Sequence, residues 1–118
     1  MQSYIHCLIP ILPVNDVKAS LEYYRDVLGF EVASVWDEDG YAVVQCGDIE
    51  IHLDKQDHFA VYRSHSYLFV ENADEIYDLY KSKHVEIIQE IESKPWGVRE
   101  FTFRDINGHM FRVAHGEK

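Results

Sequence analysis

Long hydrophobic runs are absent from this sequence of 118 residues. No window approaches the roughly 20 consecutive apolar residues that a membrane-spanning helix needs. The first four residues also lack the basic start and apolar run of a secretory signal. We therefore expect a soluble cytoplasmic protein without a membrane partner.

Basic residues are scarce as well. The 11 Lys and Arg residues stand against 21 Asp and Glu residues, so the formal net charge is −10. Such a charge repels phosphate backbones, which argues against nucleic acid as a partner. It attracts cations, although acidity alone is more often a feature of solubility than of binding.

Cysteine occurs only twice, at Cys7 and Cys46, in apolar segments far apart in the sequence. This pattern suits neither a disulfide framework nor a metal site built from cysteines. We expect both residues to be buried free thiols.

The first half of the chain predicts one strand, one helix and three further strands. Pro10 and Pro13 favour an edge or irregular strand over 8–14. Asn15 or Asp16 is suited to cap the following helix, and Gly29 is suited to the left-handed position after its end. The three further strands are predicted over 30–36, 41–46 and 49–53.

The second half repeats this order. A strand over 65–70 precedes Asn72 and Glu75, whose spacing is typical of a capping box. The elements define a module 1–54 and a module 65–118, joined by a linker 55–64 within a single domain 1–118. Neither module is large enough to close a core alone, so we expect an α+β fold in which two helices cover one face of the sheets. The strands of the second half are predicted over 65–70, 85–91, 99–104 and 109–114.

Strand alternation separates an apolar face from a polar one. Ile49, Ile51 and Leu53 are expected under a helix, whereas Glu50 and His52 point the other way. Such a polar face is often exposed to solvent without any binding role. The aromatic residues on or beside it favour the alternative interpretation, in which the face forms the wall of a ligand cleft. The candidate ligand-binding residues are Trp36, His52, His65, Tyr67, Phe69, Trp96, Glu100, Thr102 and Arg112.

Two segments of the sequence carry a family resemblance. One is 11–30, which includes LPVNDV and SLEYYRDVLGF, and the other is 103–109, FRDINGH. In these segments and in its duplicated modules, the chain resembles the vicinal oxygen chelate superfamily, also called the glyoxalase/bleomycin resistance/dioxygenase group. The resemblance implies two βαβββ modules that form a half-open, curved mixed sheet with helices on the outer face.

The segment 92–101, ESKPWGVREF, looks most like the bleomycin resistance proteins within that superfamily. The resemblance implies a small acidic homodimer that sequesters a cationic glycopeptide in clefts at the subunit interface, without catalysis and without a cofactor. It also implies stacking roles for Trp36 and Trp96. In the alternative interpretation, Trp96 is only an aromatic plug in a hairpin.

Metal-dependent members of the superfamily place one metal ligand on the first and one on the last strand of each module. Carried over by position, these ligands would be Ile9, His52, His65 and Arg112. Ile9 has no donor atom and Arg112 stays protonated, so no metal site is expected. An alternative set of His52, His65 and Glu100 would hold a divalent Zn, Ni or Fe ion. The remaining histidines are interpreted as surface or packing residues: His6, His58, His84, His109 and His115.

The sequence therefore predicts a bleomycin-resistance-like protein that binds a cationic small molecule or glycopeptide antibiotic, and it shows no catalytic residues. Two alternatives stay open. One is a glyoxalase-like or dioxygenase-like metalloenzyme that uses His52 and His65, with Glu100 as a base. The other is an orphan member of the superfamily that binds a cellular metabolite.

Overall fold

A computed structural model of the chain describes residues 4–56 and 62–117. The chain divides into two compact units, Met1–Val61 and Tyr62–Lys118, and each has its own four-stranded sheet and one helix. We call them the first and the second unit. None of the helices in the described ranges is long and apolar enough to cross a membrane.

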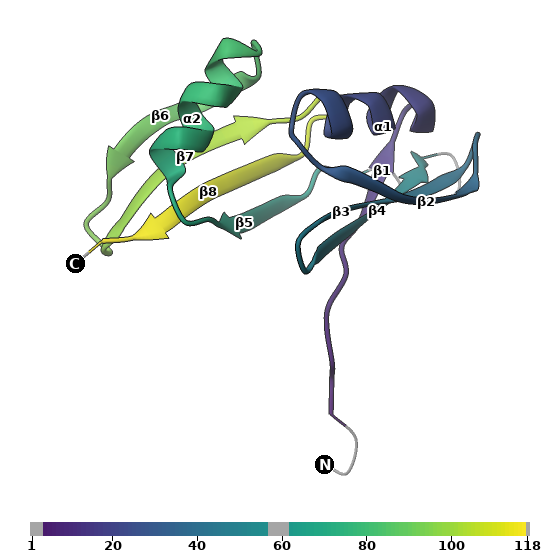
Figure 1. Ribbon diagram of the computed structural model, residues 1–118, viewed down its shortest axis with the longest axis horizontal. Coiled ribbons are helices and arrows are strands. Elements are labelled where there is room, and N and C mark those ends of the chain that lie inside the picture. Colours follow the sequence, from purple (N-terminus) through teal and green to yellow (C-terminus); the bar gives the residue numbers. More distant parts are fainter. Residues whose placement is uncertain (1–3, 57–61, 118) are drawn as a thin grey trace. The chain divides into compact units, whose positions relative to one another are not determined.

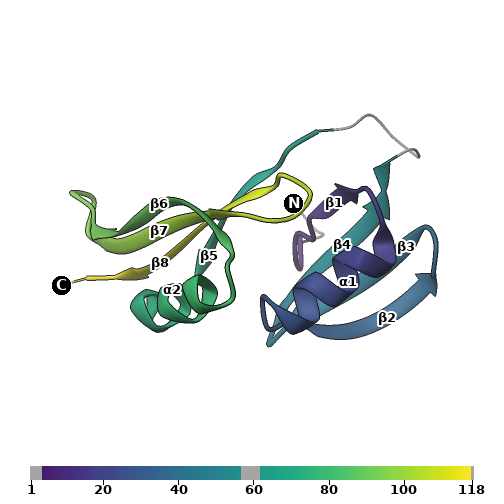
Figure 2. The ribbon, with the colours of Figure 1, turned by 90° about the horizontal axis from the view of Figure 1, so that it is seen from above.

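The first unit is one βαβββ module. Its sheet has the order β1-β4-β3-β2, with β1 parallel to β4 and the other pairs antiparallel. The helix lies across one face of this sheet (Figures 1 and 2). The elements are β1 (Ile11–Val14), α1 (Val17–Asp26), β2 (Glu31–Asp37), β3 (Tyr41–Cys46) and β4 (Ile49–Lys55).

Local sequence explains the start and end of α1. The Asp16 carboxylate accepts a hydrogen bond from the Ala19 backbone N–H at 2.9 Å, which confirms Asp16 as the N-cap. Gly29 takes the predicted left-handed conformation, with φ of 86°. The predicted first strand is shorter than expected and begins at Ile11, directly after Pro10, whose carbonyl accepts from the His52 backbone N–H at 3.0 Å.

The second unit repeats the plan. Its sheet has the order β5-β8-β7-β6, with β5 parallel to β8, and α2 covers one face of it (Figure 2). The Asn72 side chain caps α2 by accepting from the Glu75 backbone N–H at 3.2 Å, as predicted. The elements are β5 (His65–Phe69), α2 (Ala73–Ser82), β6 (Glu86–Ser93), β7 (Val98–Arg104) and β8 (Met110–Gly116).

The α+β fold with two βαβββ modules and mixed sheets is therefore confirmed. The predicted linker 55–64 differs at its start, because Lys55 belongs to β4; residues 57–61 lie outside the described ranges. That the two modules form a single domain stays a prediction.

Three expectations about burial are wrong. Both Cys7 and Cys46 are exposed: Cys7 precedes β1, and Cys46 is the last residue of β3. Ile49 is 42% exposed instead of packed under a helix. It is the first residue of β4, directly after the turn at Gly47.

Candidate ligand-binding site

In each unit, one face of the sheet packs against the helix and the other does not. We call the second one the open face. In the first unit it carries Trp36 on β2, Tyr41 on β3, and Glu50 and His52 on β4. The Trp36 and Tyr41 rings are stacked, with centroids 4.8 Å apart, and the His52 ring meets the edge of each at 5.4 Å.

Hydrogen bonds fix the His52 ring in this cluster. Its Nε2 lies 2.7 Å from Glu50 Oε1, and its Nδ1 lies 2.6 Å from the Tyr41 hydroxyl. An ionised carboxylate can only accept, so Nε2 donates to Glu50 and the Nδ1 of a neutral ring accepts from Tyr41. Both ring nitrogens of His52 are therefore occupied by protein groups.

Burial and nearby carboxylates act on Tyr41. Partial burial raises the pKa of its hydroxyl, and the charges of Asp54 and Glu50 raise it further. The hydroxyl therefore remains a hydrogen-bond donor throughout the physiological pH range.

The open face of the second unit has a different cluster. The Tyr67 hydroxyl on β5 donates to Glu100 Oε1 on β7 at 2.5 Å, and the Tyr67 ring stacks on Phe69 with centroids 5.2 Å apart. The Arg112 guanidinium on β8 lies over the Tyr67 ring, 5.5 Å from its centroid, and its Nη1 donates to the Tyr67 hydroxyl at 3.5 Å.

Tyr67 is therefore the central residue of this cluster. The hydrogen bond to its hydroxyl raises the pKa of Arg112, and the Glu100 charge adds to the shift. Tyr67 makes the direct hydrogen bond to Glu100, and Arg112 contacts Tyr67.

Two of the candidate ligand-binding residues on this face are buried, although strand alternation placed them on the polar face. Glu100 is 1% exposed and Thr102 is also buried. Both lie on the central strand β7 between β6 and β8, and Thr102 is paired directly with Arg112. Neighbouring side chains thus cover the inner strand, while the rings on the edge strand β5 stay exposed.

Trp96 lies in the turn between β6 and β7 and is 57% exposed. The Lys94 ammonium lies 5.9 Å from its ring centroid and also donates to Glu92 at 2.6 Å. That ion pair lowers the pKa of Glu92. Such exposure does not fit an aromatic plug, because a plug would be buried.

His65 begins β5 and lines a hollow of about 170 Å³ together with Ser66, Tyr67 and Arg112. The turn before β8 fixes the chain just before His65. Asp105 Oδ1 accepts from the backbone N–H groups of Asn107 and His109, at 2.9 and 2.8 Å. The buried His109 ring in turn accepts from the Ser64 backbone N–H at 3.0 Å.

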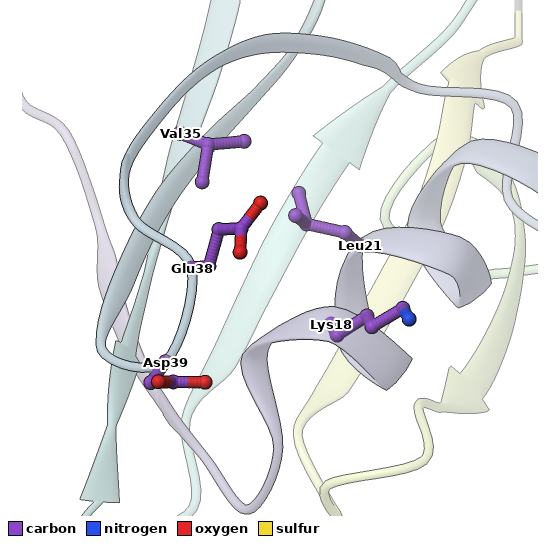
Figure 3. A pocket seen from close by; sticks show the side chains of 5 residues that line it. All are labelled: Lys18, Leu21, Val35, Glu38 and Asp39. Carbon is purple, nitrogen blue, oxygen red and sulfur yellow. The ribbon is translucent and has the colours of Figure 1, made fainter.

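Another hollow lies on the helix side of the first unit (Figure 3). It measures about 360 Å³, and Glu38, Val35 and Leu21 extend toward the same space in that view. Val35 is the β2 neighbour of Trp36, so alternation places this hollow on the face opposite the aromatic cluster. The residues that line it are Lys18, Leu21, Val35, Glu38 and Asp39.

The described ranges contain no group of three His, Cys, Asp or Glu residues placed to hold a metal ion. His52 belongs to the first unit, whereas His65 and Glu100 belong to the second. The predicted packing role fits His109, which is buried, and His115, whose Nδ1 accepts from the Ala73 N–H. His58 lies outside the described ranges.

Sequence reasoning left Tyr41 out of the candidate site. Alternation along 41–46 would have included it, since Tyr41 and Val43 share a face and Val43 pairs with His52. Arg104 was left out as well, although it follows Glu100 and Thr102 on the same face of β7. In both cases the missing signal was the cross-strand register, which fixes the neighbours of each side chain.

Comparison with known proteins agrees with this geometry. The family model described as Glyoxalase/Bleomycin resistance protein/Dioxygenase superfamily matches residues 4–113. The chain therefore belongs to this superfamily.

Part of the chain is similar to curated bleomycin resistance proteins. Over 45 residues it is 51% identical to the one from Geobacillus stearothermophilus, which is 38% of this chain and 33% of that protein. The match thus spans about a third of the length of these relatives. It shows partial homology, and the ligand of the present chain is not fixed by it.

Solved structures share the fold. A superfamily member from Sphaerobacter thermophilus is 22% identical, with a TM-score of 0.80 over 96% of this chain and 97% of that chain. The bleomycin-binding protein from Streptomyces verticillus, solved with copper(II)-bleomycin, is 24% identical, with a TM-score of 0.78 over 99% of this chain and 100% of that chain. At this identity the likeness establishes the fold.

Proposed function

We propose that the protein binds and sequesters a cationic small molecule or glycopeptide antibiotic of the bleomycin type, without catalysis. The residues proposed to bind lie on or beside the open face of each unit. In this proposal the cleft is completed at the interface of a homodimer, and the protein contributes to antibiotic resistance.

The observation that carries the proposal is the set of exposed aromatic side chains on or beside the open faces. Trp36 is 65% exposed, Phe69 is 63% exposed, and Trp96 is similarly accessible. Exposed rings of this size are costly in water and offer flat surfaces for heteroaromatic groups. Their orientation is fixed in advance, because Trp36 stacks on Tyr41 and Phe69 stacks on Tyr67.

Charge supports a cationic ligand. The chain has a net charge of −10, and Glu50 lies beside the first aromatic cluster. A host of this charge steers a cationic ligand toward the cleft and raises its association rate. The partial identity to bleomycin resistance proteins and the fold shared with a bleomycin-binding protein point to the same ligand class.

The contacts of His52 favour binding over metal chemistry. A metal ion at His52 would have to displace either Glu50 or Tyr41 from a ring nitrogen. Glu100 is likewise engaged with Tyr67. The site of His52, His65 and Glu100 remains the alternative hypothesis, and metal analysis of the purified protein tests it.

The test is a titration of tryptophan fluorescence with bleomycin, both metal-free and copper-loaded, after the bound metal has been assayed. We expect saturable quenching in metal-free protein. Trp96→Ala should weaken the affinity for bleomycin about tenfold or more, because it removes a stacking surface, while the fold is retained. Trp36 remains in this variant as the fluorescent reporter of binding. Leu79→Ala is the control, because Leu79 is an exposed apolar residue on α2.

Three results would contradict the proposal. Absence of quenching would favour the metabolite-binding alternative, and stoichiometric bound metal with activity would favour the metalloenzyme. Unchanged affinity in a destabilised Trp96→Ala protein would show that Trp96 has a packing role. The homodimer is checked separately by sedimentation equilibrium.

A further inference from the structure

One end of the second unit carries concentrated positive charge in an otherwise acidic chain. A hollow of about 600 Å³ lies at the start of β5 and the end of β7. Its lining includes two arginines and one histidine but no carboxylate, although acidic residues outnumber basic ones by 21 to 11 in the chain. The lining residues are Arg63, Ser64, His65, Arg104, Gly108 and Met110.

The strand register explains why these groups converge. His65 pairs with Met110, and Met110 pairs with Arg104, so the three residues form one row across β5, β8 and β7. Residues in one row of a sheet project from the same face. The row continues to Glu86 on β6, whose carboxylate accepts from Arg104 Nη1 at 2.9 Å.

Ser64 adds a fixed polar group to the hollow. Its backbone N–H donates to His109 Nδ1, and its carbonyl accepts from the Met110 N–H at 2.9 Å. Within the described ranges, Ser64 Oγ is the one buried side-chain polar atom without a hydrogen-bond partner. A buried hydroxyl in this state costs free energy, and an acceptor bound in the hollow would satisfy it.

Arg63 is placed by the glycine of the turn before β8. Gly108 has φ of 90°, and a Cβ built on it would lie 2.5 Å from Arg63 Nε. The absence of a side chain at Gly108 therefore lets the Arg63 side chain lie against the backbone. The guanidinium makes a long hydrogen bond of 3.4 Å to the Tyr62 carbonyl, which leaves donors for a ligand.

We propose that this hollow is a binding site for an oxyanion group, a carboxylate or a phosphate, on a small molecule. Arg63 and Arg104 supply charge-assisted donors, and Ser64 Oγ donates a neutral hydrogen bond. The site goes beyond the proposed function, because a purely cationic ligand would find two arginines and no carboxylate in the lining of this hollow. Tyr67 follows two residues after His65 on β5, so an aromatic group attached to the oxyanion would reach its ring.

The test is a titration of the full chain with inorganic phosphate, and separately with acetate, at constant ionic strength, followed by amide chemical shifts. We expect saturable shifts at Ser64, His65 and Gly108 with at least one of the two anions. Arg63→Gln and Arg104→Gln should each weaken binding about tenfold. Ser64→Ala should weaken it by a smaller factor, because its backbone hydrogen bonds remain.

Arg25→Gln is the matched control. It removes the same charge from an exposed arginine on α1 that pairs with Asp26 and does not line the hollow. Equal loss in Arg25→Gln and Arg63→Gln would overturn the proposal, because it would show only a general charge effect. Absence of saturation with both anions would also overturn it. Bleomycin binding without anion binding would reject this site alone, whereas anion binding without bleomycin binding would reject only the proposed function.

Discussion

The two units share one fold and differ in the side chains of their cores. Both have one helix over a mixed four-stranded sheet, and the strand orders β1-β4-β3-β2 and β5-β8-β7-β6 correspond position by position. The core of the first unit is mainly aliphatic, whereas α2 packs on Phe101 and Phe103 through Tyr77 and Tyr80. The same backbone plan thus accepts either kind of core, provided that the volume is filled.

The open faces differ even more. His52 on β4 and Arg112 on β8 hold corresponding places on the last strands of the two modules, yet one is an imidazole ring and the other a guanidinium, which is a permanent cation. Each is held by a tyrosine, Tyr41 in the first unit and Tyr67 in the second. The two units thus share an architecture, while the chemistry of their open faces differs.

The largest expected effect on stability comes from a substitution in the core of the second unit, compared with one in the core of the first. Phe103 is 1% exposed, stacks on Phe111 and meets the edge of Tyr80, both at 5.2 Å. Phe103→Ala should lower the free energy of unfolding by about 3 to 5 kcal/mol, because it leaves a large cavity. Leu53→Ala in the first unit should cost less, and denaturant unfolding of both variants makes the comparison. A larger loss for Leu53→Ala would show that the aliphatic core dominates.

The next effect compares the two tyrosine hydroxyls. Tyr67→Phe removes the hydrogen bond to the buried Glu100 carboxylate and should cost about 1 to 3 kcal/mol. Tyr41→Phe acts on a partly exposed cluster and should cost about 1 kcal/mol or less. Chemical denaturation measures both losses. Equal losses would mean that burial of Glu100 does not distinguish the two clusters.

A smaller effect concerns the ends of the two helices. The chain after α1 has Gly29 at φ of 86°, whereas the chain after α2 has His84 at φ of 61°. Gly29→Ala should destabilise by about 1 kcal/mol through backbone strain alone, since a Cβ there meets no atom within 4 Å. His84→Gly should raise the free energy of unfolding by roughly 0.5 kcal/mol. It relieves the strain of a left-handed residue, and this gain is partly offset by the greater freedom of glycine in the unfolded chain. Thermal unfolding that shifts in the same direction for both variants would contradict this explanation.

The smallest effect is a pH dependence in the first unit. Burial raises the pKa of Tyr41 above its ordinary value of 10.0, so the folded state retains the proton more strongly than the unfolded state. The contribution of Tyr41 to stability is therefore complete below about pH 10 and is lost as the pH rises through the folded-state pKa. Ultraviolet titration of wild type against Tyr41→Phe measures this ionisation. A Tyr41 midpoint below that of an ordinary tyrosine would refute it.

Much of the fold was predictable, because local signals were strong. Asp16 and Asn72 cap the two helices, and Gly29 adopts the left-handed conformation. Alternation along β7 places Phe101 and Phe103, both 1% exposed, on the opposite face from Glu100 and Thr102. It did not predict that Glu100 is buried, because alternation assigns a face to a residue but not its depth between neighbouring strands.

The candidate site was only partly predictable for a related reason. Tyr67 and Glu100 are 33 residues apart in the chain, and only the pairing of β5 and β7 with β8 brings the hydroxyl to the carboxylate. Arg63 belongs to no recognisable motif, and the FRDINGH segment that contains Arg104 does not show which residues lie beside it, so the convergence of the two arginines at one hollow was not visible in the sequence.

The sequence by itself determined the element order, the helix caps, the acidic charge and membership in the superfamily. These properties follow from short-range patterns and composition, which do not depend on distant contacts. The tertiary structure decided which polar atoms meet: Tyr41 with His52, Tyr67 with Glu100, and Arg104 with Glu86. Each of these pairs depends on cross-strand register, and register is set when the whole sheet packs against its helix.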